Sequence, residues 1–148
     1  MTLISGHFDS SLRFWSAEKG DSIKELPNAH KGQITSLALT SNGQQVLSCG
    51  RDDTLRLFDL RAFDCVRTMR APDFRVGLNW AKASLSADGR FAAAPGHAGD
   101  VFIWDVQNGT LHSTLSGAHD GVVSAVAFNP IQRQLASGDR AGKLTLWE

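Results

Sequence analysis

Serine, aspartate and an aromatic residue recur in this chain at fixed spacing, sometimes with an upstream histidine, and this set of side chains could form a catalytic triad. Ser48 and Asp52 precede Phe58 by ten and six residues, and His30 lies upstream. The same spacing relates Ser5 and Asp9 to Trp15; it relates Ser137 to Trp147, with His119 upstream and Ala141 in the aspartate position. The third unit keeps only Trp104. A set that recurs in several units is more typical of a structural hydrogen-bond network than of one active site.

Other reactive chemistry finds little support in the sequence. The Gly-x-Ser-x-Gly pattern of serine hydrolases is absent. Five histidines are present, but without Cys-x-x-Cys or His-Glu-x-x-His spacing, and no glycine-rich phosphate loop occurs. We therefore expect no catalytic residue, no metal site and no cofactor.

Composition narrows the class of partner. Fifteen basic and fifteen acidic side chains give a formal net charge of +0, which disfavours nucleic acid as a partner. No apolar run reaches the roughly 20 residues that span a bilayer, and the first residues do not resemble a secretion signal. We expect a cytoplasmic protein without a transmembrane segment. Cys49 and Cys65 are expected to be small buried thiols.

The aromatic positions reveal an internal repeat. Trp15, Phe58, Trp104 and Trp147 lie 43, 46 and 43 residues apart, close to the roughly 40–45 residues of a unit with four β-strands. Within each unit, short stretches such as 55–58 alternate apolar and polar residues, as strands do, and Asn-Gly or Asp-Gly turns separate them. The pattern predicts an all-β chain with three, four, four and three strands in its successive units.

These units resemble WD repeats. Ala29-His30 and Ala118-His119 occupy the position of the family's Gly-His, and Trp104-Asp105 is a literal Trp-Asp pair. The resemblance implies a partial β-propeller of about three and a half four-stranded antiparallel blades, an open arc formed by one domain over residues 1–148. The blades are expected at approximately 2–29, 30–72, 73–117 and 118–148. Closed propellers typically have 4–8 blades, so we expect either a fragment or completion by a partner, and possible self-association through open blade edges.

The stretches LISGHFDSSLRFW (3–15) and VLSCGRDDTLRLFDLR (46–61), with the segment from Ala71 to Trp80, are similar to the C-terminal propeller of the autophagy-related 16-like family. That resemblance implies a protein-interaction scaffold that docks short motifs of partner proteins and is recruited through them to autophagic membranes. The family's upstream coiled coil is absent, so this chain alone is not expected to support lipidation. Two alternatives stay open: a WD-repeat adaptor of another pathway, such as a ubiquitin-ligase substrate receptor, and, from a different class, a propeller hydrolase.

A binding surface is expected on one rim of the arc, where the loops before the first strand and after the second strand of each blade meet. Arginine and aromatic side chains among acidic neighbours suit a peptide partner. The resemblance implies a lysine in the position of Gln33. Trp80 is open to two interpretations, a core residue between blades or a partner-facing residue. The candidates for partner binding are Lys31, Gln33, Arg51, Asp53, Asp73, Phe74, Arg75, Trp80, Asp139 and Arg140.

Overall fold

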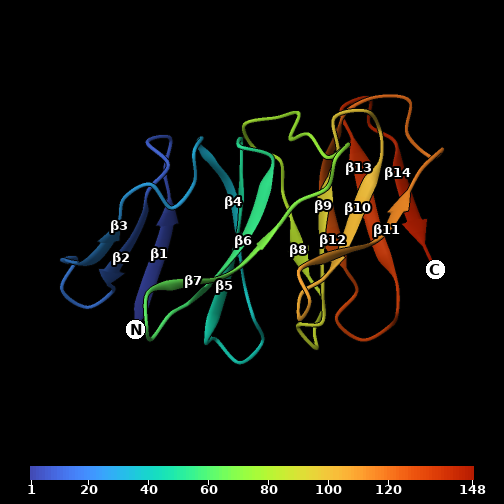
Figure 1. The fold of residues 1–148 in the computed structure, drawn as a ribbon. Coiled ribbons are helices and arrows are strands. Elements are labelled where there is room, and N and C mark those ends of the chain that lie inside the picture. The colour runs from blue at the N-terminus through green and yellow to red at the C-terminus, as the bar shows by residue number, and fades with distance from the viewer.

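The computed structural model describes all 148 residues and contains four antiparallel sheets arranged in one row (Figure 1). The first sheet holds β1 (Thr2–Gly6), β2 (Leu12–Ser16) and β3 (Ser22–Leu26). The second holds β4 (Ile34–Leu39), β5 (Gln45–Gly50), β6 (Thr54–Asp59) and β7 (Asp64–Met69). The third holds β8 (Ser84–Leu85), β9 (Phe91–Pro95), β10 (Val101–Asp105) and β11 (Thr110–Leu115). The fourth holds β12 (Val123–Phe128), β13 (Leu135–Asp139) and β14 (Leu144–Trp147).

The row of sheets is an open arc. Neighbouring sheets meet through their innermost strands, since β4 contacts β1 and β8, and β12 contacts β8 and β9. The first and fourth sheets lie at opposite ends of the row in Figure 1. This confirms the predicted all-β partial propeller with three, four, four and three strands. No helix is long and apolar enough to cross a membrane.

Alternation of buried and less buried residues marks strands such as β6, and several tight turns contain a glycine with positive φ. In β6, Leu55 and Leu57 are buried while Arg56 between them is half-buried. Gly43 and Gly89 have φ of 66° and 71° in the turns before β5 and β9. Side chains other than glycine, asparagine and aspartate rarely adopt this conformation. These turns close the hairpins at the lower end of the arc in Figure 1.

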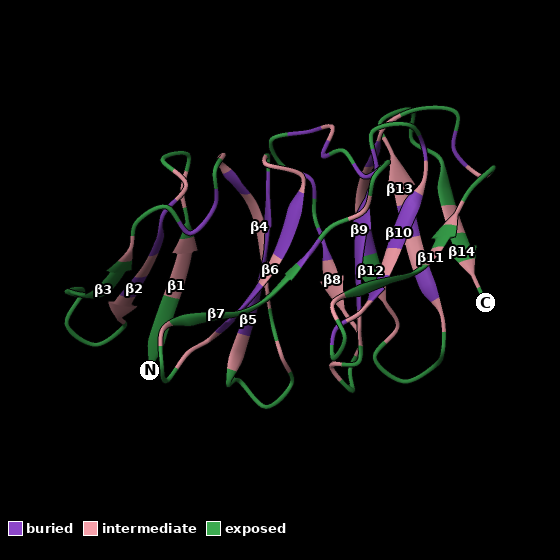
Figure 2. Cartoon of the chain, viewed as in Figure 1, coloured by how far each residue is buried: buried purple, intermediate pink, exposed green.

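The largest core cluster fills the space between the second and third sheets, and Figure 2 shows the buried strands there. Phe74 is completely buried, with its ring 4.9 Å from the ring centre of Trp104 and 5.3 Å from that of Phe102. The prediction that Phe74 binds a partner on the rim is therefore wrong. Ala92 and Ala94 of β9 are small buried residues of the same cluster, which leaves room for three large aromatic side chains in one interior.

The segment from residue 71 to 83 connects the second and third sheets without a regular strand. The inner strand of the third blade, β8, has only two residues, Ser84–Leu85. The backbone just before it bonds to the neighbouring sheets instead: the Thr35 hydroxyl donates to the Ala81 carbonyl at 2.8 Å, and the Lys82 N–H donates to the Ser124 carbonyl at 3.0 Å. The inner strand of the third blade is thus largely replaced by contacts to the blades on either side.

The two cysteines differ in environment. Cys49 is completely buried in β5, and burial raises the pKa of its thiol to about 12. Cys65 is exposed on the outer strand β7, so the expectation that both thiols are buried is wrong for Cys65. The outer strand β7 presents most of its side chains to solvent. The apolar residues next to Cys65 in the sequence do not reveal that exposure.

Candidate functional site

The second sheet contains a closed hydrogen-bond network around His30. The ring Nδ1 of His30 lies 2.8 Å from Asp52 Oδ1, and its Nε2 lies 2.7 Å from the Ser48 hydroxyl. Asp52 Oδ1 also accepts the Thr54 hydroxyl, and Oδ2 accepts the backbone N–H of Lys31, each at 2.8 Å. Burial opposes ionisation of Asp52, but the hydrogen bonds from His30, Lys31 and Thr54 outweigh it and hold the pKa of Asp52 well below its usual value. The network ties the loop before β4 to the turn between β5 and β6.

The fourth sheet builds the same network with a different aspartate. Trp147 Nε1 donates to the Ser137 hydroxyl at 2.8 Å, Ser137 lies 2.7 Å from His119 Nε2, and His119 Nδ1 lies 2.9 Å from Asp139 Oδ2. Asp139 Oδ1 accepts the backbone N–H groups of Ala141 and Lys143 at 2.9 Å. Those turn bonds, chiefly the one from Lys143, together with His119 lower the pKa of Asp139.

Two predictions about the fourth sheet are therefore corrected. Asp139 is not a partner-binding rim residue, because its side chain is only 4% exposed and is bound to His119. Ala141 does not leave the network without an aspartate. The tight turn after β13 brings Asp139, the last residue of that strand, to the position that Asp52 reaches from within the turn after β5. Spacing in the sequence could not reveal this shift of two residues.

In the first sheet, the tryptophan N–H also donates to a serine, but the histidine comes from the same sheet's own β1–β2 turn. Trp15 Nε1 donates to the Ser5 hydroxyl at 2.8 Å, and Ser5 lies 2.7 Å from His7 Nε2. Asp9 takes no part, contrary to the prediction. It is half-exposed and accepts bonds from Ser11 and Arg13. The hydrogen bonds from the Ser11 side chain and backbone lower the pKa of Asp9 to about 2. Asp9 closes the turn between β1 and β2 rather than bracing the sheet interior.

The third sheet has no histidine or serine in these positions, and its tryptophan bonds to the preceding blade. Trp104 Nε1 donates to the Arg70 carbonyl at 3.0 Å, with the indole fully buried. In the second sheet Phe58 occupies the same position, is buried, and has no N–H to donate. Three of the four sheets therefore give their aromatic residue a hydrogen-bond acceptor, and the second uses phenylalanine, which needs none.

The triad-like sets do not expose a nucleophile. Ser48 is 0% and Ser137 is 1% exposed, and both hydroxyls are engaged by histidine inside the sheet. In these two sheets the arrangement connects residues of the loops and strands and so braces the fold. No group of three or more His, Cys, Asp or Glu side chains lies close enough to hold a metal ion.

The upper end of the arc in Figure 1 carries the loops that the sequence analysis expected to form a rim. Trp80 is 62% exposed there, so it is not a wedge between blades. Lys31, Asp73 and Arg140 are exposed, and Gln33 is half-buried. Phe8, in the turn between β1 and β2, is 79% exposed and was missed by sequence reasoning. The sequence held a signal for this exposed residue: Phe8-Asp9 occupies the same place in its turn as Arg51-Asp52 does in the second blade.

Three other rim candidates hold the chain together. Arg51 donates from Nη1 to the Val76 carbonyl, and Asp53 Oδ1 accepts the Val76 N–H at 2.8 Å. Arg75 lies with its Nε 3.7 Å from Asp53 Oδ2 and donates to two nearby carbonyls. These residues form a clamp that fixes the connecting segment to the turn after β5. The structure brings them together for support, while leaving half of the Arg75 side chain in solvent.

Successive antiparallel sheets, each with an aromatic residue in its third strand and two with a His–Ser–Asp brace, define a segment of a WD-repeat β-propeller. The sequence profile of the family described as "WD domain, G-beta repeat" matches residues 20–59 and 109–148, and the chain belongs to that family.

Individual relatives are similar over almost the whole chain. Protein tipD of Dictyostelium discoideum is 39% identical over 99% of the chain, and protein Atg16l2 of Mus musculus is 38% identical over 98%. Autophagy-related protein 16 of Arabidopsis thaliana is 31% identical over 99%. The chain covers 24%, 23% and 28% of these three proteins, so it spans about a quarter of the length of the relatives it matches.

Proposed function

We propose that this chain is a protein-docking module of an autophagy-related scaffold and that its upper rim binds short segments of partner proteins. One of the relatives is named autophagy-related protein 16 and another protein Atg16l2, and all three match at least 98% of the chain. A WD-repeat segment with its polar networks buried offers surfaces rather than a reaction centre. The module acts in the cytoplasm and reaches autophagic membranes through its partners.

The exposure of Trp80 is the main support for the rim as the docking surface. A tryptophan with 62% of its surface in solvent is unusual for a residue that proteins prefer to bury. Tryptophan and arginine dominate the binding energy of many protein interfaces. Arg140 and Lys31 add unpaired positive charge to the same rim. A peptide with an apolar anchor and acidic neighbours has the complementary chemistry.

Proximity labelling in starved cells tests this proposal. The wild-type chain is compared with Trp80→Ala and with Ile131→Ala, whose side chain is 91% exposed in the turn between β12 and β13. Autophagy proteins should be labelled by the wild-type and Ile131→Ala chains and lost with Trp80→Ala. Labelling dominated by ubiquitin-ligase subunits would favour the adaptor of another pathway. Equal labelling by all three chains would contradict the proposal that partners bind the rim around Trp80.

The hydrolase alternative has its own test. A fluorophosphonate probe reacts with activated serines, and we expect no labelling of the folded chain because Ser48 and Ser137 are buried. Labelling of either serine, abolished by mutation of its histidine, would contradict the docking proposal.

A further inference from the structure

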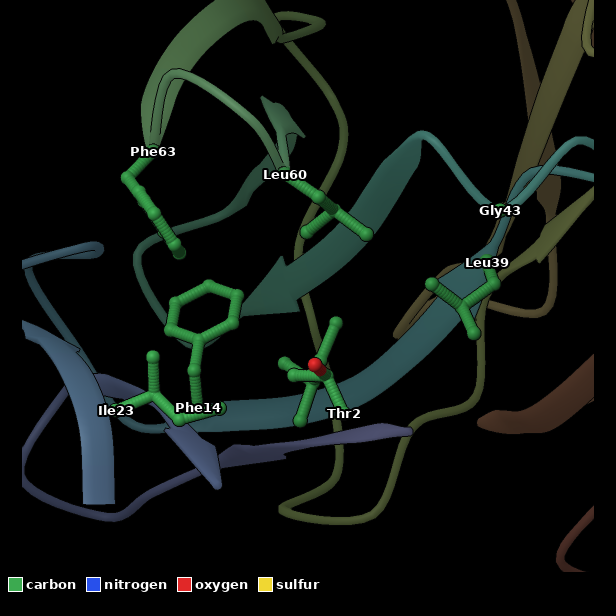
Figure 3. Close-up of a pocket in the computed structure, with 8 residues that line it drawn as sticks. Thr2, Phe14, Ile23, Leu39, Gly43, Leu60 and Phe63 are labelled. Atoms are coloured by element: carbon green, nitrogen blue, oxygen red, sulfur yellow. The ribbon is translucent and has the colours of Figure 1, made fainter. Parts of the chain in front are cut away.

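An apolar pocket lies between the first and second sheets, with Phe14, Ile23 and Phe63 in its lining (Figure 3). A second groove, separate from the rim, runs between the second and third sheets at the lower end of the arc. It has a volume of about 590 Å³ and is lined by the turn before β9, by β7 and by the residues after β10. The apolar part of its lining comes from Leu57, Val66 and Val106. Val66 is 44% exposed, whereas Leu57 and Val106 are nearly buried, so an apolar strip faces an open groove. This arrangement could cover one aliphatic or aromatic side chain of a partner.

The polar lining of this groove has two arginines, one aspartate and two glutamines, Gln45 and Gln107. Arg67 and Arg90 both line it, and neither guanidinium has a carboxylate oxygen within 4.0 Å. Asp88 is the acidic residue of the lining, and its Oδ1 is already occupied by the Ser86 hydroxyl at 2.6 Å and the Arg90 N–H at 3.0 Å. Four of the ten arginines of the chain, Arg13, Arg56, Arg61 and Arg75, pair with a carboxylate. Arg67 and Arg90 are exposed and have no such partner, so the groove offers two guanidinium groups to an external carboxylate, and with Asp88 its lining has a net positive charge.

Both arginine side chains, although exposed, pack against a neighbouring group of the chain. The guanidinium of Arg90 lies over the ring of Phe91, 5.0 Å from its centre. The aliphatic stem of Arg67 lies over Gly109, where a Cβ would come within 2.8 Å of Arg67 Cδ. The φ of Gly109 is +72°, which favours glycine at this point in the turn before β11. Side chains packed in this way lose less conformational freedom on binding, and guanidinium groups bind carboxylates through two parallel hydrogen bonds.

We propose that this groove, defined by Leu57, Val66, Arg67, Arg90 and Val106, is a second docking site that binds an acidic linear peptide carrying one apolar side chain. The carboxylates pair with Arg67 and Arg90, and the apolar side chain covers Val66. The site lies at the end of the arc opposite Trp80, so one chain can hold two partners, or two segments of one partner, at the same time. A peptide that engages both ends would gain affinity from the linkage alone.

The test measures binding of synthetic peptides to the full 148-residue chain by fluorescence anisotropy. The probe is a labelled peptide with a central leucine flanked by glutamates; a copy with glutamine for glutamate and a copy with phosphoserine for glutamate are the comparisons. We expect the acidic peptide to bind, the glutamine copy to lose about tenfold or more in affinity, and binding to weaken at high salt. No binding of the acidic peptide, or equal binding of the glutamine copy, would overturn the proposal. Tighter binding of the phosphoserine copy would assign the groove to phosphorylated segments instead.

Variants locate the binding. Arg67→Gln with Arg90→Gln should weaken the acidic peptide about tenfold or more. Lys19→Gln with Arg133→Gln removes the same charge from exposed residues outside the groove and should leave affinity unchanged. Amide chemical shifts of the wild-type chain provide a test that needs no variant. On titration with the acidic peptide, the amide signals of Val66, Gly89 and Gln107 should shift, and that of Trp80 should not. Shifts confined to the rim would refute the groove as the site.

Discussion

Asp139 accepts a hydrogen bond from the ring of His119, with Oδ2 and Nδ1 2.9 Å apart, and the same carboxylate holds the turn after β13. Asp139→Ala should therefore lower the urea midpoint of unfolding, because His119 and two turn N–H groups lose their acceptor. Asp120→Ala, an exposed neighbour of His119, is the control and should leave the midpoint in place. Equal midpoints for both variants would show that the fourth sheet does not depend on this pair.

Asp52→Ala should destabilise the chain by about 1–3 kcal/mol, the usual effect of stranding buried donors. The donors are the His30 ring, the Thr54 hydroxyl and the Lys31 N–H. Chemical denaturation against the wild type measures the difference. A loss below the error of the measurement would contradict the role of Asp52 as the centre of the brace.

Acidic pH should remove the contribution of Asp52 to the stability of the fold. Its pKa in the folded chain is lower than in the unfolded chain, where aspartate titrates near 3.9. The stabilisation is therefore complete above that value and is lost as the pH falls toward the folded pKa. The stability gap between wild type and Asp52→Asn should be constant from about pH 7 to pH 5 and should narrow below about pH 4. A gap that widens on acidification would reverse the assigned sign.

Phe74 and Trp80 lie six residues apart in the connecting segment and should respond oppositely to truncation. Phe74→Ala removes a fully buried ring from between Phe102 and Trp104 and should cost about 3–5 kcal/mol. Trp80→Ala removes a mostly exposed side chain and should change stability by under about 0.5 kcal/mol. Thermal melts of the two variants decide the matter. A large loss for Trp80→Ala would mean that it packs against the fold.

The chain in isolation should self-associate at high concentration. Leu144 and Leu146 project from the same side of β14 and are 77% and 59% exposed. Leu3 at the other end is 52% exposed. Exposed apolar faces and free strand edges promote association, and a net charge of +0 does not oppose it. Light scattering after gel filtration should detect dimers or larger species, reduced by Leu144→Ser with Leu146→Ser. A wild-type monomer at about 100 µM with a cooperative melt would contradict this expectation.

The repeat architecture could be predicted from sequence alone because its signals are local. Aromatic spacing sets the length of each unit, alternation sets the strands, and glycines or Asp-Gly pairs set the turns. The number of strands per sheet and most strand bounds follow from these signals. So does the His30–Ser48–Asp52 network, whose members lie in one sheet and in the loops next to its strands. The shortened β8 was not predictable, since the segment before it bonds across blades to Thr35 and Ser124 rather than along its own sheet.

By itself, the sequence determined the fold class, the open row of sheets and the family, because periodicity and short motifs reflect each residue's own strand and turn. Only the tertiary structure decided which side chains of the rim face solvent. Phe74 turned inward because the alanines of β9 left space beside Trp104, and Trp80 stayed outside because no blade packs over it. The sequence predicted Asp139 on the surface, but the turn after β13 places its side chain in a buried position against His119. Burial depends on what neighbouring blades place opposite a residue, and that contact is not encoded in the residue's local pattern.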